Sequence, residues 1–202
     1  MIKIILVGAG GHAKSCIDVI ETTKTLKIAG IIDKNVGKKR ISGYQVIGSD
    51  KNLAKYKKKY KYAFIVIGQI KSSKIRKSIY NNLISLGYKL PIIKSKHAYV
   101  SKNSNIGIGT IIMHGAAVNT NVKIGKNCII NTKSLIEHDV KIGNHCHIST
   151  GAIINGGVSI GDGTFVGSGS IIKEGIKIGK ECVVGAGCIV KKNISSNKII
   201  TI

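Results

Sequence analysis

An aliphatic residue occupies every sixth position of this chain from residue 100 to residue 190, without a gap. The sixteen members of the series are Val100, Ile106, Ile112, Val118, Ile124, Ile130, Ile136, Ile142, Ile148, Ile154, Ile160, Val166, Ile172, Ile178, Val184 and Val190. A period of six is typical of the hexapeptide β-helix, and it fits neither an α-helix nor a simple alternating strand. The series therefore predicts a solenoid with its aliphatic side chains directed inward.

A slower repeat sets the expected cross-section of this solenoid. Every third aliphatic residue is followed by glycine, in the pairs Ile106-Gly107, Ile124-Gly125, Ile142-Gly143, Ile160-Gly161 and Ile178-Gly179. The spacing of 18 residues predicts a triangular prism of about five coils, stacked at about the 4.8 Å spacing of neighbouring strands. Four of the five cysteines fall on the second inward position of the hexapeptide, and no Cys-x-x-Cys spacing indicates a disulfide framework or a zinc site.

The first 90 residues predict a small α/β domain instead. Strands are expected at residues 2–7, 28–33, 43–47 and 62–67, and helices at 13–23, 51–60 and 72–86. This alternation of strands and helices indicates a parallel sheet of Rossmann type. The only proline, Pro91, marks the junction with the repeats. We therefore expect two domains, residues 1–90 and residues 91–202.

The first expected strand runs into a glycine-rich turn, Gly8-Ala9-Gly10-Gly11-His12-Ala13, which matches the pattern G-x-G-x-x-[G/A]. Glycines let the backbone approach a phosphate, and the N-terminus of the next helix supplies N–H donors and positive potential. Asp33 follows the second strand, where an acid commonly contacts a ribose. The domain is about half the usual dehydrogenase size, and His12 directly follows the glycines. These features favour a nucleotide or nucleotide-sugar site.

The segment Glu137-His138-Asp139 holds the strongest candidate for catalysis. His138 lies between two carboxylates, at a position that does not point into the prism. A carboxylate beside an imidazole fixes its tautomer and raises its basicity, as a general base near neutral pH requires. We therefore expect His138 to be the catalytic base. His147 is the expected ligand-binding histidine one corner further along, whereas His114 and His145 are expected on the surface.

The composition adds limits on partners and location. A formal net charge of +23 suits anionic partners such as nucleotide phosphates or coenzyme A, but we favour the interpretation that most lysines are solvated surface. No aromatic-rich basic stretch indicates nucleic-acid binding. The N-terminus lacks the features of a secretory signal, and no apolar run reaches the length of about 18 residues that a membrane span requires. A cytoplasmic protein without membrane insertion is expected.

The glycine turn with its histidine, followed by a hexapeptide prism with an Ile-Glu-His-Asp segment, resembles the bacterial sugar acetyltransferases that use acetyl-CoA. One similar branch N-acetylates UDP-4-amino-sugars in bacillosamine-type pathways. The other is the family named for sialic acid O-acetylation, whose segment looks like residues 131–138. The resemblance implies a left-handed β-helix, acetyl-CoA as co-substrate, no metal, and a homotrimer with an active site at each interface. Met113 and Phe165 would be interfacial residues of such a trimer.

The resemblance also implies roles for individual residues. His138 would be the general base, and Asp139 the acid that raises its basicity. Acetyl-CoA would be bound by His147, Gly156, Ser168 and Ala186. The nucleotide-sugar would be bound by Gly10, Gly11, His12, Asp33, Lys34 and Gly68. Lys34 stands where the bacillosamine branch has a second acid, so recognition of the uracil or ribose is expected to differ. Relatives usually continue beyond the position of Ile202, so we do not rely on a tail contact to the coenzyme.

Several functions stay open on the sequence. We favour direct transfer of acetyl from acetyl-CoA to the amino group of a UDP-4-amino-sugar for surface glycan biosynthesis, in a ternary complex and without an acyl-enzyme. A sialic acid O-acetyltransferase would differ only in the acceptor. A non-catalytic nucleotide-binding module would bind a ligand without releasing coenzyme A. A zinc carbonic anhydrase on the same prism would need three converging histidines, for which His138, His145 and His147 are the candidates.

Overall fold

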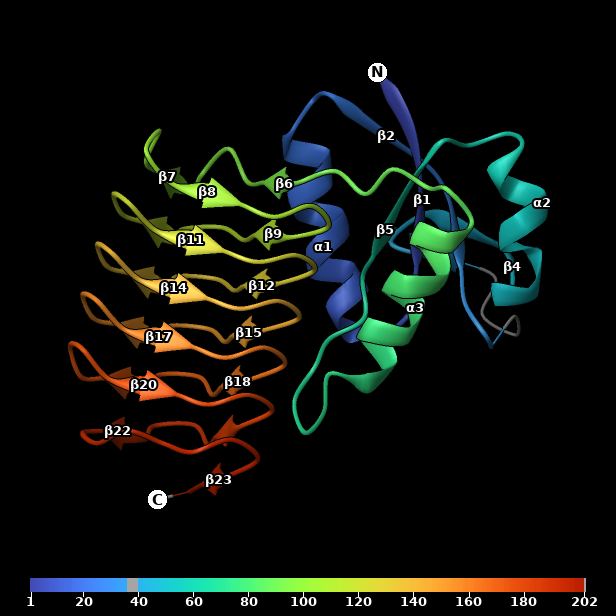
Figure 1. Ribbon diagram of the computed structural model, residues 1–202. Coiled ribbons are helices and arrows are strands. Elements are labelled where there is room, and N and C mark those ends of the chain that lie inside the picture. The colour runs from blue at the N-terminus through green and yellow to red at the C-terminus, as the bar shows by residue number, and fades with distance from the viewer. Residues whose placement is uncertain (36–39, 202) are drawn as a thin grey trace.

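The computed structural model describes residues 1–35 and 40–201, and it shows an α/β domain packed against one side of a triangular β-helix (Figure 1). The α/β domain has a five-stranded sheet in the order β3-β4-β2-β1-β5. Its strands are β1 (Ile2–Val7), β2 (Leu26–Ile32), β3 (Arg40–Ile41), β4 (Tyr44–Gly48) and β5 (Tyr62–Ile65). The pairs among β1, β2, β4 and β5 are parallel, as the sequence predicted.

Two local features of this domain differ from the sequence-based expectations. β3 is an antiparallel edge strand joined to β4 by a turn in which Ser42 and Gly43 have positive φ, and two residues are too few to show a strand period. The helix expected over residues 51–60 is a 3₁₀ turn, η1 (Asp50–Asn52), followed by a short helix, α2 (Leu53–Lys57). The other helices are α1 (Gly11–Thr22) and α3 (Lys74–Ser85), close to the expected ranges.

The helices cover both faces of the sheet. On one face, α1 buries Ala13, Cys16, Ile17 and Ile20 against the sheet, and the same cluster continues into residues of the β-helix. On the other face, the sheet packs on α2 and α3 through a separate cluster that includes Leu53 and Leu83. α1 therefore lies between the sheet and the β-helix, and this places the glycine turn at its N-terminus close to the prism.

The β-helix has three faces, each a parallel sheet of two-residue strands. We call the first the covered face, because the N-terminal domain lies on it: β6 (Ile93–Lys94), β9 (Ile111–Ile112), β12 (Ile129–Ile130), β15 (His147–Ile148), β18 (Phe165–Val166), β21 (Val183–Val184) and β23 (Ile199–Ile200). The second is the apolar face: β7 (Tyr99–Val100), β10 (Ala117–Val118), β13 (Leu135–Ile136), β16 (Ile153–Ile154), β19 (Ile171–Ile172) and β22 (Ile189–Val190). The third is the lysine face: β8 (Asn105–Ile106), β11 (Lys123–Ile124), β14 (Lys141–Ile142), β17 (Ser159–Ile160) and β20 (Lys177–Ile178).

The register of these strands confirms the hexapeptide prediction. From β6 to β22 each residue pairs with the one 18 positions on, as in Ile124 with Ile142 and Ile136 with Ile154, whereas β21 pairs with β23 at a spacing of 16. The predicted inward aliphatics form one core, which also holds all four predicted cysteines, Cys128, Cys146, Cys182 and Cys188. The chain is thus a left-handed β-helix preceded by a Rossmann-like domain, as expected from the resemblance.

One corner of the prism forms the joint between the two parts. Asn127, His145, Gly163 and Glu181 stack at the corner between the lysine face and the covered face, each with positive φ. The segment from Gln69 to Tyr80 docks on this column: Gln69 donates to the Gly163 carbonyl, and Ser73 donates to the Glu181 carboxylate at 3.0 Å. These contacts fix the N-terminal domain on the covered face.

The interfacial role expected of Met113 and Phe165 is corrected by this joint. Met113 is buried in the cluster that contains α1, and Phe165 packs edge-on against His147. Both lie on the covered face and contact the chain's own N-terminal domain or its neighbours in the joint. The sequence period shows that a residue points outward, but it does not show what covers it.

Candidate active site

His138 and Asp139 lie together at the corner between the apolar face and the lysine face. The Nδ1 atom of His138 is 2.8 Å from Oδ2 of Asp139. Because a carboxylate only accepts, Nδ1 is the donor, and the neutral ring keeps its lone pair on Nε2. Asn121 donates to the other oxygen of Asp139, and hydrogen bonds from His138 and Asn121 lower the pKa of this carboxyl group. The geometry suits a general base with an exposed Nε2.

The other flanking acid has a different partner. Glu137 accepts a hydrogen bond from Asn119 at 2.9 Å and does not pair with the imidazole. Glu137, His138 and Asp139 line a surface cavity of about 550 Å³ with Gly156 of the next coil. The structure thus brings the expected base, its acid and one expected coenzyme residue to the same corner.

The remaining residues expected at the coenzyme are elsewhere on the prism. Ser168 and Ala186 are exposed, 18 residues apart, at the corner between the covered face and the apolar face. The apolar face separates this corner from the one that holds His138. His147 is only 6% exposed and lies on the covered face.

His147 is held firmly inside the joint. Its Nδ1 donates to the Gln69 carbonyl at 2.6 Å, and Nε2 accepts from Asn131 at 3.1 Å. Its ring is 6.3 Å from that of His12. Burial lowers the pKa of both histidines to about 4, with the Arg76 charge contributing to both shifts. Both rings are therefore neutral near pH 7.

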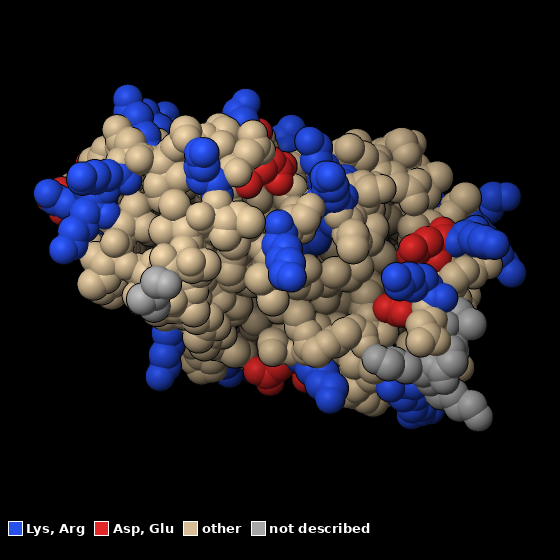
Figure 2. Space-filling model, turned by 90° about the horizontal axis from the view of Figure 1, so that it is seen from below, with Lys and Arg blue, Asp and Glu red and all other residues tan. Residues whose placement is uncertain are grey.

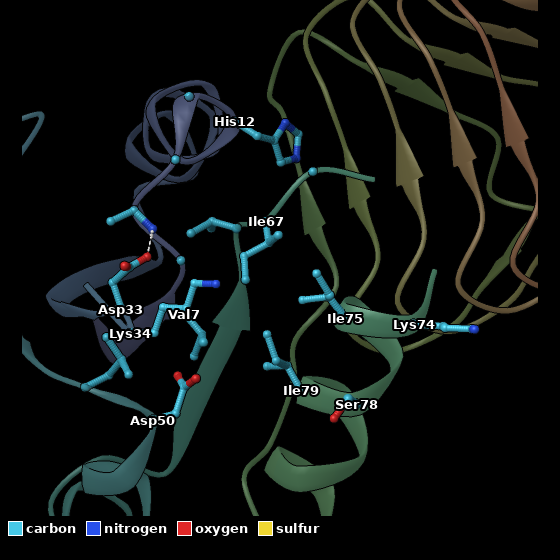
Figure 3. Close-up of a pocket in the computed structure, with 17 residues that line it drawn as sticks. Val7, His12, Asp33, Lys34, Asp50, Ile67, Lys74, Ile75, Ser78 and Ile79 are labelled. Atoms are coloured by element: carbon cyan, nitrogen blue, oxygen red, sulfur yellow. Dashed lines mark hydrogen bonds between the residues drawn. The ribbon is translucent and has the colours of Figure 1, made fainter. Parts of the chain in front are cut away.

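All six residues expected at a nucleotide-sugar line one cavity of about 680 Å³ in the N-terminal domain. They are Gly10, Gly11, His12, Asp33, Lys34 and Gly68. The cavity lies at the carboxyl ends of the parallel strands, where ligands bind in open α/β sheets. Figure 3 shows that the ring of His12 is directed toward the β-helix, whereas Val7, Lys34 and Asp50 surround the cavity.

The glycine turn has the shape that a phosphate needs. A Cβ at Gly10 or Gly11 would meet no atom within 4 Å, so the space beside the N-terminus of α1 is open. Gly8 has φ +116° and its hydrogen faces Ile67, which leaves no room for a side chain there. Asp33 braces the turn by accepting from the backbone N–H of Ala9 at 2.6 Å. An anion would therefore meet backbone N–H groups and a helix N-terminus.

Sequence reasoning missed two residues around this cavity and its wall. Asp50 lines the cavity from the turn after β4, and its position two residues after the end of a strand was the available signal. Arg76 is 1% exposed and donates to the carbonyl of Ile67, which lines the cavity, and to both oxygens of Asn127 in the β-helix. Burial lowers the pKa of Arg76 to about 10. No sequence pattern marked it, because it lies in a helix with ordinary periodicity.

The other prism histidines also have partners within the chain. His145 contacts Asn127 and packs edge-on against Tyr80, and His114 bridges Ser95 and Asp18 of α1. His145 is thus half-buried in the joint and not on the open surface. Among the described residues, no three His, Cys, Asp or Glu side chains converge as a metal site would require.

The positive charge does not gather at one site on the face shown in Figure 2. Lysine and arginine side chains are scattered there and separated by uncharged surface, as expected for solvated lysines. No helix within residues 1–35 and 40–201 is long and apolar enough to cross a membrane.

Comparison with known families agrees with this architecture. Residues 3–83 match the PglD N-terminal domain, residues 121–156 match the bacterial transferase hexapeptide (six repeats), and residues 157–192 match the hexapeptide repeat of succinyl-transferase. No curated protein matches the sequence closely enough to count as a relative.

Several solved structures are similar over almost the whole chain. PerB, a perosamine N-acetyltransferase from Caulobacter crescentus in complex with CoA and GDP-perosamine, has a TM-score of 0.92 and 29% identity, covering 98% of this chain and 92% of that one. The acetyltransferase domain of PglB from Neisseria gonorrhoeae, in complex with acetyl coenzyme A, has a TM-score of 0.90 and 27% identity, covering 98% and 94%. WeeI from Acinetobacter baumannii has a TM-score of 0.89 and 25% identity, covering 100% and 97%.

The repeats, the open histidine corner and these matches define the class: the chain is a hexapeptide-repeat acetyltransferase whose co-substrate is a coenzyme A thioester. More particularly, it is similar to sugar N-acetyltransferases of known structure, and its first 83 residues match the PglD N-terminal domain that here precedes the β-helix.

Proposed function

We propose that the protein transfers acetyl from acetyl-CoA to the amino group of a nucleotide-activated amino sugar, with His138 as general base. The observation that carries the proposal is the His138–Asp139 pair, which holds the imidazole with its Nε2 lone pair toward solvent. The nucleotide part of the acceptor occupies the cavity at the glycine turn. The sequence prediction named UDP as this nucleotide, and the similar PerB structure contains GDP-perosamine.

The reaction needs no covalent enzyme intermediate. The acceptor amine attacks the thioester carbonyl while Nε2 of His138 takes its proton. The C–S bond then breaks, and the sulfur leaves as coenzyme A thiol after taking a proton from the imidazolium. Asp139 stabilises the imidazolium that forms in between. The prism cysteines are inward and buried, so none of them offers a nucleophile.

The two halves of the proposed site lie on different sides of one chain. The nucleotide cavity belongs to the domain that rests on the covered face, whereas His138 is at the corner opposite that face. In a triangular prism this corner is the farthest from the covered face. We therefore propose that an acceptor bound by one chain is acetylated by His138 of another chain.

The apolar face is the surface through which a second chain would pack. Its outward side chains form one column next to the His138 corner: Tyr99, Ala117, Leu135, Ile153, Ile171 and Ile189. Tyr99 is 60% exposed and Ile189 is 61% exposed in the single chain. A continuous apolar column of this kind indicates a protein interface. We propose a homotrimer, in which Gly156, Ser168 and Ala186 border the coenzyme along the edges of this face.

His147 fits this arrangement as a structural residue of the joint. Both of its ring nitrogens are engaged within the chain and its side chain is buried. Contact between acetyl-CoA and His147 stays a prediction, as it does for Gly156, Ser168 and Ala186, of which Ser168 and Ala186 are exposed.

The first experiment measures release of coenzyme A thiol from acetyl-CoA with several acceptors in parallel. Nucleotide-linked 4-amino-sugars should release thiol and sialic acid should not, whereas release with sialic acid alone would favour the O-acetyltransferase. Ligand binding without thiol release would favour a binding module. His138→Ala should lose about 10²–10⁴ in rate, and His97→Ala, at an exposed prism histidine outside the site, should keep full activity.

A mixing experiment tests transfer between chains. Gly11→Asp places a carboxylate where the phosphate would bind and leaves the fold intact, because a side chain there has open space. Mixed trimers of His138→Ala and Gly11→Asp chains should regain activity, since one chain supplies the cavity and another the base. If the mixture stays as inactive as either variant alone, the acceptor is acetylated within one chain.

A further inference from the structure

The order of the residues along the nucleotide cavity indicates where the base of a bound nucleotide would lie. Across the carboxyl edge of the sheet, the turns after β4, β2, β1 and β5 contribute Asp50, Asp33, the glycine turn and Gly68 in that order. Phosphates belong at the glycine turn, and the acid after the second strand is the usual ribose contact. The base therefore lies beyond Asp33, on the side of β4 and Asp50.

Asp50 is the carboxylate available to the base. Asp33 already uses one oxygen for the Ala9 N–H and the other for the Asn35 N–H, at 2.6 and 2.8 Å. Asp50 is exposed, and within the described part of the chain its carboxylate has no hydrogen bond or ion pair. Figure 3 shows the carboxylate of Asp50 directed into the cavity, on the same side as Lys34.

The turn that carries Asp50 is built to a fixed shape. The Asn52 side chain accepts from the Ser49 backbone N–H at 2.9 Å, which closes the turn over Asp50. Gly48 approaches Asn52 so closely that a Cβ would lie 2.7 Å from Oδ1. The direction of the Asp50 side chain is therefore set by the local sequence Gly-Ser-Asp-Lys-Asn.

A carboxylate at this position selects among bases by hydrogen-bond pattern. An ionised carboxylate offers only acceptors. Guanine presents two adjacent donors, N1–H and the N2 amino group, which match the two carboxylate oxygens. Uracil presents a single N–H between two carbonyl oxygens, and these would repel the carboxylate. Adenine presents one amino group beside an acceptor nitrogen. Guanine alone makes two charge-assisted bonds without repulsion.

We propose that Asp50 is the base-reading residue and that the acceptor is a guanosine diphosphate amino sugar. The inference rests on the proposed function, because it assigns the nucleotide of the same acceptor. The Lys34 side chain, which lines the same cavity, matches the remaining acceptor on the guanine edge, O6. A paired contact of this type discriminates by about 5- to 150-fold between bases.

The test compares binding of GDP and UDP by titration calorimetry. The wild-type protein should bind GDP at least about tenfold more tightly than UDP, and inosine diphosphate, which lacks the N2 amino group, should fall between them. Asp50→Asn should weaken GDP binding about tenfold and tighten UDP binding, since an amide offers both a donor and an acceptor to uracil. Asp18→Asn, at an exposed aspartate of α1 outside the cavity, should leave both affinities unchanged.

The outcomes separate this proposal from the proposed function. Equal or tighter binding of UDP by the wild-type protein, or an unchanged GDP-to-UDP ratio in Asp50→Asn, overturns the assignment of Asp50 and leaves the acetyltransferase proposal standing. If GDP, UDP and ADP all fail to bind at millimolar concentration, the cavity is not a nucleotide site and both proposals fall. A reversed preference in Asp50→Asn supports the assignment, because a loss of folding would weaken both ligands together.

Discussion

The imidazole of His138 lies directly against Gly156 of the next coil. A Cβ built on Gly156 would be 2.8 Å from both Cε1 and Nε2 of that ring. The two positions are 18 residues apart, so the repeat itself stacks them. Glycine at 156 thus leaves the space in which the proposed base stands, in addition to any contact with the coenzyme.

Gly156→Ala should therefore lower activity with little effect on folding. The added methyl group moves the ring and not the backbone, and a misplacement of about 1 Å can cost about 10²-fold in rate. We expect kcat to fall 10- to 100-fold with an unchanged unfolding midpoint. Gly143→Ala is the contrast, because its Cβ would lie 2.7 Å from the backbone nitrogen of Asp162 and should reduce stability. A Gly156→Ala enzyme with wild-type kcat would refute this account.

Asp139→Asn should reduce kcat by about 10- to 100-fold, less than removal of a fully buried triad acid. An amide can donate to Nδ1 and so place the ring proton on Nε2, which removes the base. Hydrogen bonds from His138 and Asn121 lower the pKa of Asp139, so the wild-type carboxyl group stays ionised in the neutral pH range. The dependence of kcat on pH measures this for the wild-type protein and for Asp139→Asn. If kcat of the wild-type protein falls at acidic pH and this fall is absent in Asp139→Asn, the Asp139 carboxyl group titrates in that range and the expectation is wrong.

Arg76→Ala should destabilise the joint between the two parts of the chain. The change removes hydrogen bonds to Ile67 and Asn127 and leaves a cavity, and together these should cost about 3 kcal/mol in the free energy of unfolding. Urea denaturation measures the loss. The chain's only other arginine, Arg40, is exposed, and Arg40→Ala should change stability by less than about 0.5 kcal/mol. Equal effects of the two substitutions would contradict a structural role for Arg76.

Stability should fall as the pH drops from about 6.5 to about 4. Burial lowers the pKa of His12 and His147 from 6.5 to about 4, so the unfolded chain binds more protons than the folded one in this window. The contribution of the two neutral histidines to the free energy of unfolding is fully present above pH 6.5 and is lost on acidification. The loss is at most about 3 kcal/mol for each histidine.

Free energies of unfolding at pH 7.5, 6.0 and 4.5 measure the slope of stability against pH. His147→Asn should flatten it, whereas His97→Asn, at an exposed histidine, should not. A slope that is the same in all three proteins would show that the buried histidines do not govern it.

A charge on the apolar face should disrupt assembly. Ile171 lies in the middle of the apolar column, and Ile171→Glu would bury a carboxylate at the proposed interface. We expect light scattering to show a trimer for the wild-type protein and a monomer for this variant, with thiol release lost in parallel. Lys141→Glu on the lysine face should remain trimeric. A wild-type monomer with full activity would contradict both the interface and transfer between chains.

Much of the fold could be read from the sequence because it follows from short-range rules. The six-residue period placed the inward residues, such as Ile136 and Cys146, since every coil repeats the same environment. The glycine turn and Asp33 were found because a strand, a turn and a helix in succession leave a recognisable pattern. His138 and Asp139 are neighbours in the chain, so their pairing needed no tertiary information.

Only the tertiary structure decided what lies over each outward position. His147 and Met113 point away from the prism core like His138 does, but α1 and the segment after β5 bury them, while His138 stays open. Arg76 and Asn127 are 51 residues apart, and no local pattern brings them together. Periodicity fixes the direction of a side chain relative to its own element, whereas burial depends on which other element packs there. For that reason the sequence determined the prism and its candidate base, and the packing of the N-terminal domain determined which face is covered and which corner remains accessible.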